Sequence, residues 1–188
     1  MREFDSIYHE FRPKIHRYLS NLTCDNDAPD LTQTVFLKIS RSLDNFREES
    51  SLSTWIYRIA TNTAHDHAVS SLAKQNAFEL LFDDADLIDD LPDTGFQGSD
   101  LEYIRREMNS CIREIIDKLP QDFRTVLILS DFEELKDHEI SEILGLRLNT
   151  VKIRLHRARA KLREALECLC TFYHDERSEL ACDRKGDE

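Results

Sequence analysis

Residues 143–163 hold seven Lys or Arg and no Asp or Glu, in a chain with 37 acids, 25 bases and a net charge of −12. Clustered cations of this kind neutralise phosphate groups, and a helix that bears them can reach base edges with the side chains near its start. The block predicts DNA binding; an ordinary solvated basic helix is the alternative. The predicted helix carries six of these cations, with His156 among them: Lys152, Arg154, Arg157, Arg159, Lys161 and Arg163.

A helix-turn-helix is the element predicted to position these side chains. A short helix with apolar residues from Ile140 to Leu144 ends where Gly145 can adopt a left-handed conformation. Asn149 is a candidate N-cap for a second helix. That helix would bury a stripe at helical spacing and turn its cations outward. The stripe consists of Val151, Leu155, Ala158 and Leu162.

The rest of the chain also has helical apolar spacing, so the predicted class is all-α: two small helical domains joined by an acidic linker, the C-terminal one a helix-turn-helix. The predicted boundaries are 1–75, 76–100 for the linker, 101–170, and 171–188 for a tail with cysteines. Asp30, and then Ser53 or Thr54, are the expected N-caps in the first domain. Residues 76–104 hold nine acids and no Lys or Arg, which fits a linker with a specific role or a plain solvated tether.

Composition excludes several classes of protein. Only four Gly and four Pro are present, which argues against a turn-rich sheet fold. No apolar run is long enough for a membrane span and the N-terminus has no signal-peptide pattern, so we expect a cytoplasmic protein. Five cysteines, an odd number, argue against a disulfide framework.

The residues from Asn149 to Arg159 resemble the C-terminal promoter-binding domain, region 4, of sigma factors of the extracytoplasmic-function (ECF) group, together with Leu119-Pro120 before them. Independently, Asp30–Lys38 is similar to the polymerase-docking helix of that family, and Phe46–Asn62 to its promoter-melting segment, region 2. Both similarities occur in the family's order, and together they cover most of residues 4 to 170.

The resemblance implies a transcription initiation factor, not an enzyme, with core RNA polymerase and promoter DNA as partners, an anti-sigma factor as regulator, and neither a cofactor nor a small-molecule substrate. The helix from Asp30 to Leu43 would bind the coiled coil of the largest polymerase subunit. The implied polymerase contacts are Asp30, Gln33, Phe36 and Lys38. The implied −10 contacts are Phe46, Ser53, Trp55, Tyr57, Arg58 and Asn62. The implied −35 contacts are Asn149, Thr150, Lys152, Ile153, Arg154, His156, Arg157 and Arg159.

The sequence departs from the family pattern at several positions. Ile153 stands where a small polar residue is usual, Asn149 where Gly is usual, and Thr34 where an acid is usual. The stretch 68–75 lacks the basic cluster that often follows the melting helix. Promoter binding is therefore expected to depend more on the C-terminal domain. Trp55 has a second interpretation, as a packed core residue.

The tail leaves a further alternative open. Three thiols and an imidazole could form a four-ligand metal site, although C-x-C is not a standard zinc spacing, and reduced cysteines on a fraying helix are the other interpretation. The candidate ligands are Cys168, Cys170, His174 and Cys182. The competing functions are a helix-turn-helix regulator that does not bind polymerase, and a metal- or redox-responsive variant that uses these cysteines.

Overall fold

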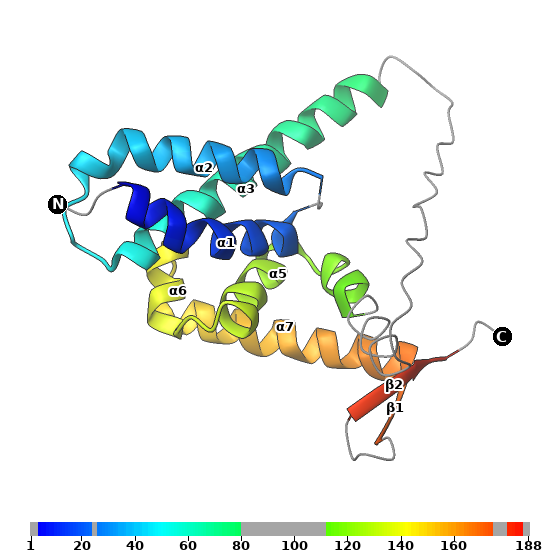
Figure 1. The fold of residues 1–188 in the computed structure, drawn as a ribbon. Coiled ribbons are helices and arrows are strands. Elements are labelled where there is room, and N and C mark those ends of the chain that lie inside the picture. Colours follow the sequence, from blue (N-terminus) through cyan, green and yellow to red (C-terminus); the bar gives the residue numbers. More distant parts are fainter. Residues whose placement is uncertain (1–3, 24–25, 80–111, 175–179, 186–188) are drawn as a thin grey trace, which may run out of the picture.

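The computed structural model describes residues 4–23, 26–79, 112–174 and 180–185 (Figure 1). Its helices are α1 (Phe4–Leu22), α2 (Ala28–Ser42), the 3-10 turn η1 (Leu43–Asn45), α3 (Leu52–Glu79), α5 (Gln121–Leu127), the π-helical η2 (Ile128–Phe132), α6 (Asp137–Leu144) and α7 (Leu148–Leu169). Residues 112–117 are also helical. Two strands, β1 (Cys170–His174) and β2 (Leu180–Arg184), follow α7.

Helices α1, α2 and α3 form the N-terminal unit, because each turns one apolar face inward. Ile15, Val35 and Ile56 come from the three helices and are fully buried. Tyr18 is also buried, and its hydroxyl lies 2.8 Å from the Thr61 hydroxyl, so the one polar atom of this ring has a partner. α1 continues through Pro13, which lies inside the helix.

The C-terminal unit comprises residues 112–169. Val126 and Leu127 on α5, Ile140 on α6 and Val151 on α7 are buried together in its core. α5 contacts α7, and α6 contacts both α7 and η2. The stripe predicted on the second helix is confirmed: Val151, Leu155 and Ala158 are buried, and Leu162 packs partly buried against the same core.

The two units pack against each other. α6 lies against α3 (Figure 1), and η2 contacts α1. The buried side chains of both units belong to one continuous cluster. The predicted all-helical class is confirmed for both. Of the predicted linker, only residues 76–79 are described, as the end of α3, and the rest lies outside the described residues.

The tail differs from the fraying helix that was one interpretation of it. α7 ends at Leu169, and β1 and β2 form an antiparallel hairpin in which Phe172 pairs with Cys182 and Cys170 with Arg184. The end of the hairpin is bonded to the end of α7, since the Lys185 backbone N–H donates to the Leu169 carbonyl at 2.9 Å.

Three predicted helix starts are wrong by two or three residues. α2 begins at Ala28 after Asp27, so Asp30 lies within its first turn. α3 begins at Leu52, and the Ser51 hydroxyl, not Ser53 or Thr54, accepts a hydrogen bond from the Thr54 backbone N–H at 3.0 Å. α7 begins at Leu148, which places Asn149 inside the helix. Around α2 and α3 several residues are able to cap, and sequence alone did not choose among them. At α7 the N-cap position is held by Arg147, whose side chain makes no capping hydrogen bond.

Candidate nucleic-acid interface

The turn between α6 and α7 sets the direction of the basic helix. Gly145 has φ 63° and ψ 29°, the left-handed conformation expected for it, and the Leu146 N–H donates to the Ser141 carbonyl at 3.0 Å. Arg147 is extended, and its carbonyl accepts from the N–H groups of Thr150 and Val151 at 2.9 and 3.2 Å. α7 therefore starts immediately after the turn, with its buried stripe fixed against the C-terminal unit.

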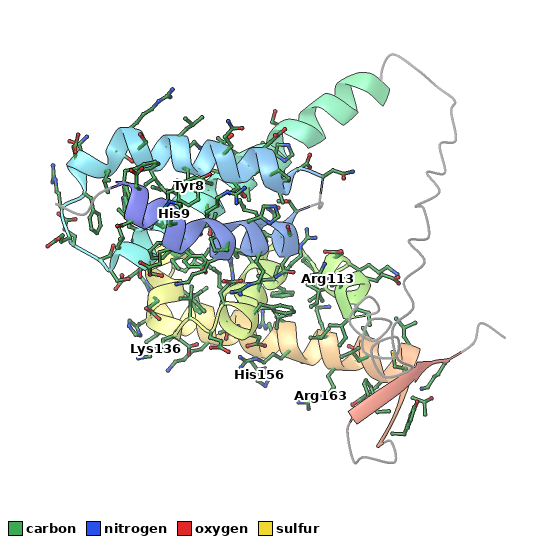
Figure 2. The ribbon with its side chains drawn as sticks, in the orientation of Figure 1. Tyr8, His9, Arg113, Lys136, His156 and Arg163 are labelled. Carbon is green, nitrogen blue, oxygen red and sulfur yellow. The ribbon has the colours of Figure 1, made fainter. Side chains whose placement is uncertain are left out.

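The side of α7 opposite that stripe is exposed. Successive residues advance about 100° around a helix, so Ile153 lies roughly 160° from Leu155 and 200° from Val151. Figure 2 shows His156 and Arg163 on the side of α7 turned away from α1 and α2. We call the exposed side the outer face of α7. It consists of Asn149, Ile153, His156, Arg157 and Ala160, all exposed.

Two arginines at the edges of this face are paired with carboxylates, which the sequence did not predict. An Arg154 guanidinium nitrogen lies 2.8 Å from an Asp122 carboxylate oxygen. The Arg159 Nε donates to Asp131 at 3.1 Å, and a second guanidinium nitrogen bonds the same carboxylate. The basic block has no acids in sequence, but the fold brings acids to it from α5 and η2.

Burial raises the pKa of Asp131, yet hydrogen bonds from Arg159 and Ser130 outweigh it and hold that pKa below its ordinary value. The same pair raises the pKa of Arg159. The other cations of the block make no salt bridge with any described residue, and their side chains are exposed. They are Arg147, Lys152, Arg157, Lys161 and Arg163.

The predicted −10 contacts divide into two groups. Phe46 and Trp55 lie together at the start of α3, with ring centroids 5.0 Å apart, and both are half-buried, as is Ser53. Asn62 is exposed further along α3. Trp55 packs against the core and also retains an exposed part.

The remaining two predicted −10 contacts face the C-terminal unit. Tyr57 is 3% exposed, and its hydroxyl donates to Glu133 Oε2 at 2.6 Å. Burial, and then this hydrogen bond, raise the pKa of Tyr57 far above its ordinary value. The Arg58 Nε donates to the Glu142 carbonyl at 3.1 Å. Both interactions join α3 to residues more than 70 positions later in the chain.

Glu133 is the centre of this junction. Its side chain is 1% exposed, and Arg17 of α1 donates to both carboxylate oxygens at 3.1 and 2.8 Å. The chain brings Glu133 here through the π-helical turn, since its N–H donates to the Ile128 carbonyl and the following Glu134 takes a left-handed φ of 55°. We call the interactions of Glu133 with Arg17 and Tyr57 the Glu133 contact.

A pocket of about 300 Å³ lies between the two units. Asn62 and His65 of α3 line one side of it, and Asp122 and Arg154 line the other. In this arrangement one end of the α3 face is covered by the C-terminal unit, while the outer face of α7 remains open.

The predicted polymerase contacts lie at one groove, with a single exception. Asp30, Gln33 and Phe36 line a groove between α1 and α2 of about 670 Å³. Phe36 is only 3% exposed and packs edge-on against Tyr8, with ring centroids 4.9 Å apart. Lys38 does not line the groove; its Nζ donates to the Thr63 hydroxyl at 3.0 Å.

Leu37 is a residue of this groove that sequence reasoning missed. It is 51% exposed although apolar and lies between two members of the predicted set. The apolar spacing of an amphipathic helix does not reveal such a residue, because a leucine next to the buried stripe is predicted to be buried as well. An apolar side chain in an open groove suits the packing of a partner helix.

The tail cysteines form no recognisable metal cluster in the described part of the chain, where no three His, Cys, Asp or Glu side chains are grouped to hold an ion. Cys168 is exposed and Cys170 is buried. The described residues also contain no helix with the length and hydropathy needed to cross a bilayer.

Comparisons with known proteins agree with this geometry. The family model described as "Sigma-70 region 2" matches residues 7–71, and that described as "Sigma-70, region 4" matches residues 109–162. The RNA polymerase sigma-H factor of Pseudomonas aeruginosa is 32% identical over 170 residues, 89% of this chain and 88% of that protein. The ECF RNA polymerase sigma-E factor of Haemophilus influenzae is 30% identical and covers 89% of each chain. The RNA polymerase sigma factor SigZ of Bacillus subtilis is 32% identical and covers 91% of each.

Two solved structures share the fold. One is the sigma factor RpoE in complex with the anti-sigma factor NepR from Bartonella quintana, with a TM-score of 0.68, 20% identity, and coverage of 89% of this chain and 98% of that one. The other is CnrH in complex with the cytosolic domain of CnrY, with a TM-score of 0.62, 21% identity and 88% coverage of each chain. The chain belongs to the ECF group of the sigma-70-type RNA polymerase sigma factors, proteins that bind core RNA polymerase and initiate transcription from promoter DNA.

Proposed function

We propose that this chain directs core RNA polymerase to its promoters by laying the outer face of α7 in the major groove of the −35 element. The observation that carries the proposal is the arrangement of α7: a buried stripe anchors the helix, and exposed cations surround the opposite face. A helix placed this way reads base edges with its first turns and holds phosphate with its later ones. Asn149, Thr150, Lys152 and Ile153 stand in the first turns.

The N-terminal unit supplies the other two activities. A helix of the polymerase would occupy the groove between α1 and α2, against Leu37, Gln33 and Asp30, as an amphipathic helix does in an apolar groove. Phe46, Trp55 and Asn62 would hold unstacked bases of the −10 strand, because aromatic faces stack on bases and an amide reads their edges. Tyr57 and Arg58 can join them only after the units separate, since both are bonded to the C-terminal unit.

We further propose that the protein acts in the cytoplasm, performs no catalysis of its own, and is controlled by an anti-sigma factor. Of the solved structures that share this fold, one is a complex with an anti-sigma factor and another a complex with the cytosolic domain of a partner protein. A regulator that covers the groove of α1 and α2 and the outer face of α7 would block both polymerase and promoter. The segments 1–75, 76–100, 101–170 and 171–188 are the proposed domain limits.

In vitro transcription tests the proposal. Core polymerase plus this chain, on DNA from upstream of its own gene, should start transcripts at a defined position. Leu37→Glu should abolish these starts and the capture of core polymerase, because it places a charge in the proposed docking groove. Val69→Glu is the matched control: Val69 is 53% exposed, on α3, and lies outside the groove. Specific DNA binding without any polymerase capture would instead indicate a helix-turn-helix regulator.

A further inference from the structure

Ile153 is an exposed apolar side chain at the centre of a polar, cationic surface. It is 53% exposed, as much as any large apolar residue for which the structure gives an exposure. Its neighbours on the outer face of α7, one turn before and one turn after, are Asn149, His156 and Arg157. No packing role accounts for Ile153, because the residues that anchor α7 lie on the opposite side of the helix.

The cations around Ile153 restrict what it can meet. Lys152 and Arg157 are exposed and have no salt-bridge partner among the described residues, so a polyanion is the complementary surface. Arg154 and Arg159 mark the two edges of the face and are held by Asp122 and Asp131. The part of α7 that is free to enter a DNA groove is therefore its outer face, with Ile153 at the centre.

The chemistry of the major groove then identifies the contact. Base edges there present hydrogen-bond donors and acceptors, and the C5 methyl group of thymine is the one apolar group among them. An isoleucine has neither donor nor acceptor, so opposite any other base edge it would remove water from polar atoms without replacing their hydrogen bonds. Opposite thymine it buries a methyl group against its own methyl and ethyl groups.

We propose that Ile153 makes the chain select thymine at one position of the −35 element by van der Waals contact with the C5 methyl group. This inference rests on the proposed function, since it assumes that α7 reads the −35 element. It deepens that function by assigning a base to a residue that replaces the small polar side chain usual in the family.

Uracil in place of thymine removes the methyl group and leaves the hydrogen bonds of the base pair unchanged. The test begins with the full chain and core polymerase, which select binding sites from duplexes randomised over the −35 window. Each thymine of the selected element is then replaced singly by deoxyuridine. We expect one position at which the wild-type complex binds about fourfold more weakly, the factor that corresponds to burying one methyl-sized group.

The variants assign that effect to Ile153. Ile153→Ser should bind the thymine and uracil duplexes equally, and Ile153→Val should retain most of the difference. Val69→Ser is the matched control, because Val69 is as exposed as Ile153 and lies on α3, and it should keep the full wild-type difference.

Each result has one meaning. A selected element without thymine, or an equal uracil effect in the wild type and Ile153→Ser, overturns the inference and leaves the proposed function in place. If Ile153→Ser keeps DNA binding and loses only the binding of a regulatory protein, Ile153 is a protein contact. That result also overturns the inference and leaves the proposed function in place. If no sequence is selected and no defined start occurs, the proposed function fails and this inference fails with it.

Discussion

The two faces proposed to meet promoter DNA are presented very differently. The outer face of α7 is open along its length, and two of its flanking arginines are already held in place by aspartates. The α3 face is divided: Phe46, Trp55 and Asn62 retain exposed surface, but Tyr57 is buried under the C-terminal unit. The outer face of α7 can therefore bind a duplex directly. Part of the α3 face must first be uncovered before it can bind a single strand.

This difference follows from what each face must do. A duplex presents its groove before any opening, so a rigid, exposed helix can bind it at once. Single-stranded bases exist only after the duplex is opened, and a pocket for them is needed at that later stage. In this chain the cover over the second site is its own C-terminal unit, held by the Glu133 contact.

The largest expected effect comes from breaking the Glu133 contact. Glu133→Ala removes the buried carboxylate that Arg17 and Tyr57 share and leaves the Tyr57 hydroxyl without its partner. We expect the contact between the units to weaken by about 3 kcal/mol, the low end for a broken buried pair, because Arg17 is itself 59% exposed. Energy transfer between fluorophores at Ser40 and Lys161 should report a longer distance in this variant.

The matched control for that experiment is Glu142→Gln. Glu142 is an exposed acid near the same junction, and only its backbone carbonyl accepts a hydrogen bond from Arg58, so its side chain can change without effect on the contact. Equal distances and equal unfolding free energies in Glu133→Ala and the wild type would show that the Glu133 contact does not hold the units together.

A second, smaller effect should separate the unpaired cations of α7 from the paired ones. Arg157→Ala should lower the slope of log affinity against log salt by about 0.9 and weaken duplex binding roughly tenfold near 0.1 M salt. Arg154→Ala should change the slope by less than half as much, because Asp122 already neutralises Arg154. Fluorescence anisotropy with a labelled duplex measures both slopes.

The converse variant sharpens this comparison. Asp122→Asn releases Arg154 for phosphate and should steepen the salt dependence, which no loss-of-charge variant on α7 can do. Identical slopes for Arg157→Ala and Arg154→Ala would mean that the ion pair with Asp122 does not persist in solution.

The smallest effect concerns acid stability. Since hydrogen bonds hold the pKa of Asp131 below its ordinary value, its ionised form stabilises the folded state above about pH 4. That contribution is lost as pH falls from the unfolded pKa through the lower folded one. For a partly exposed pair it should be below about 1 kcal/mol. Melting temperatures between about pH 6 and pH 3 should fall less in Asp131→Asn than in the wild type; parallel curves would contradict the pairing.

The sequence predicted α7 well because its signals are local. Helical spacing of Val151, Leu155 and Ala158, and a glycine at the end of the preceding helix, depend on residues within a few turns of each other. Helix starts were predicted less well, since Ser51, Ser53 and Thr54 can all cap and tertiary packing chooses among them.

The Glu133 contact could not be predicted in the same way. Glu133 is one of 37 acids, and its neighbours in sequence give no sign that its side chain becomes buried. Its partner Arg17 is 116 residues away and looks like any other cation on a surface helix. The pairing of Arg154 and Arg159 with aspartates could not be predicted either, because no local sequence pattern indicates a long-range ion pair.

The central claim, one open face and one covered face, is tested most directly by offering the free chain both kinds of DNA. Without core polymerase, the wild type should bind a duplex that contains its −35 element. It should bind a single-stranded −10 oligonucleotide at least tenfold more weakly than Glu133→Ala does. A tenfold difference in affinity corresponds to about 1.4 kcal/mol. Equal binding of the single strand by the wild type and Glu133→Ala would contradict the account.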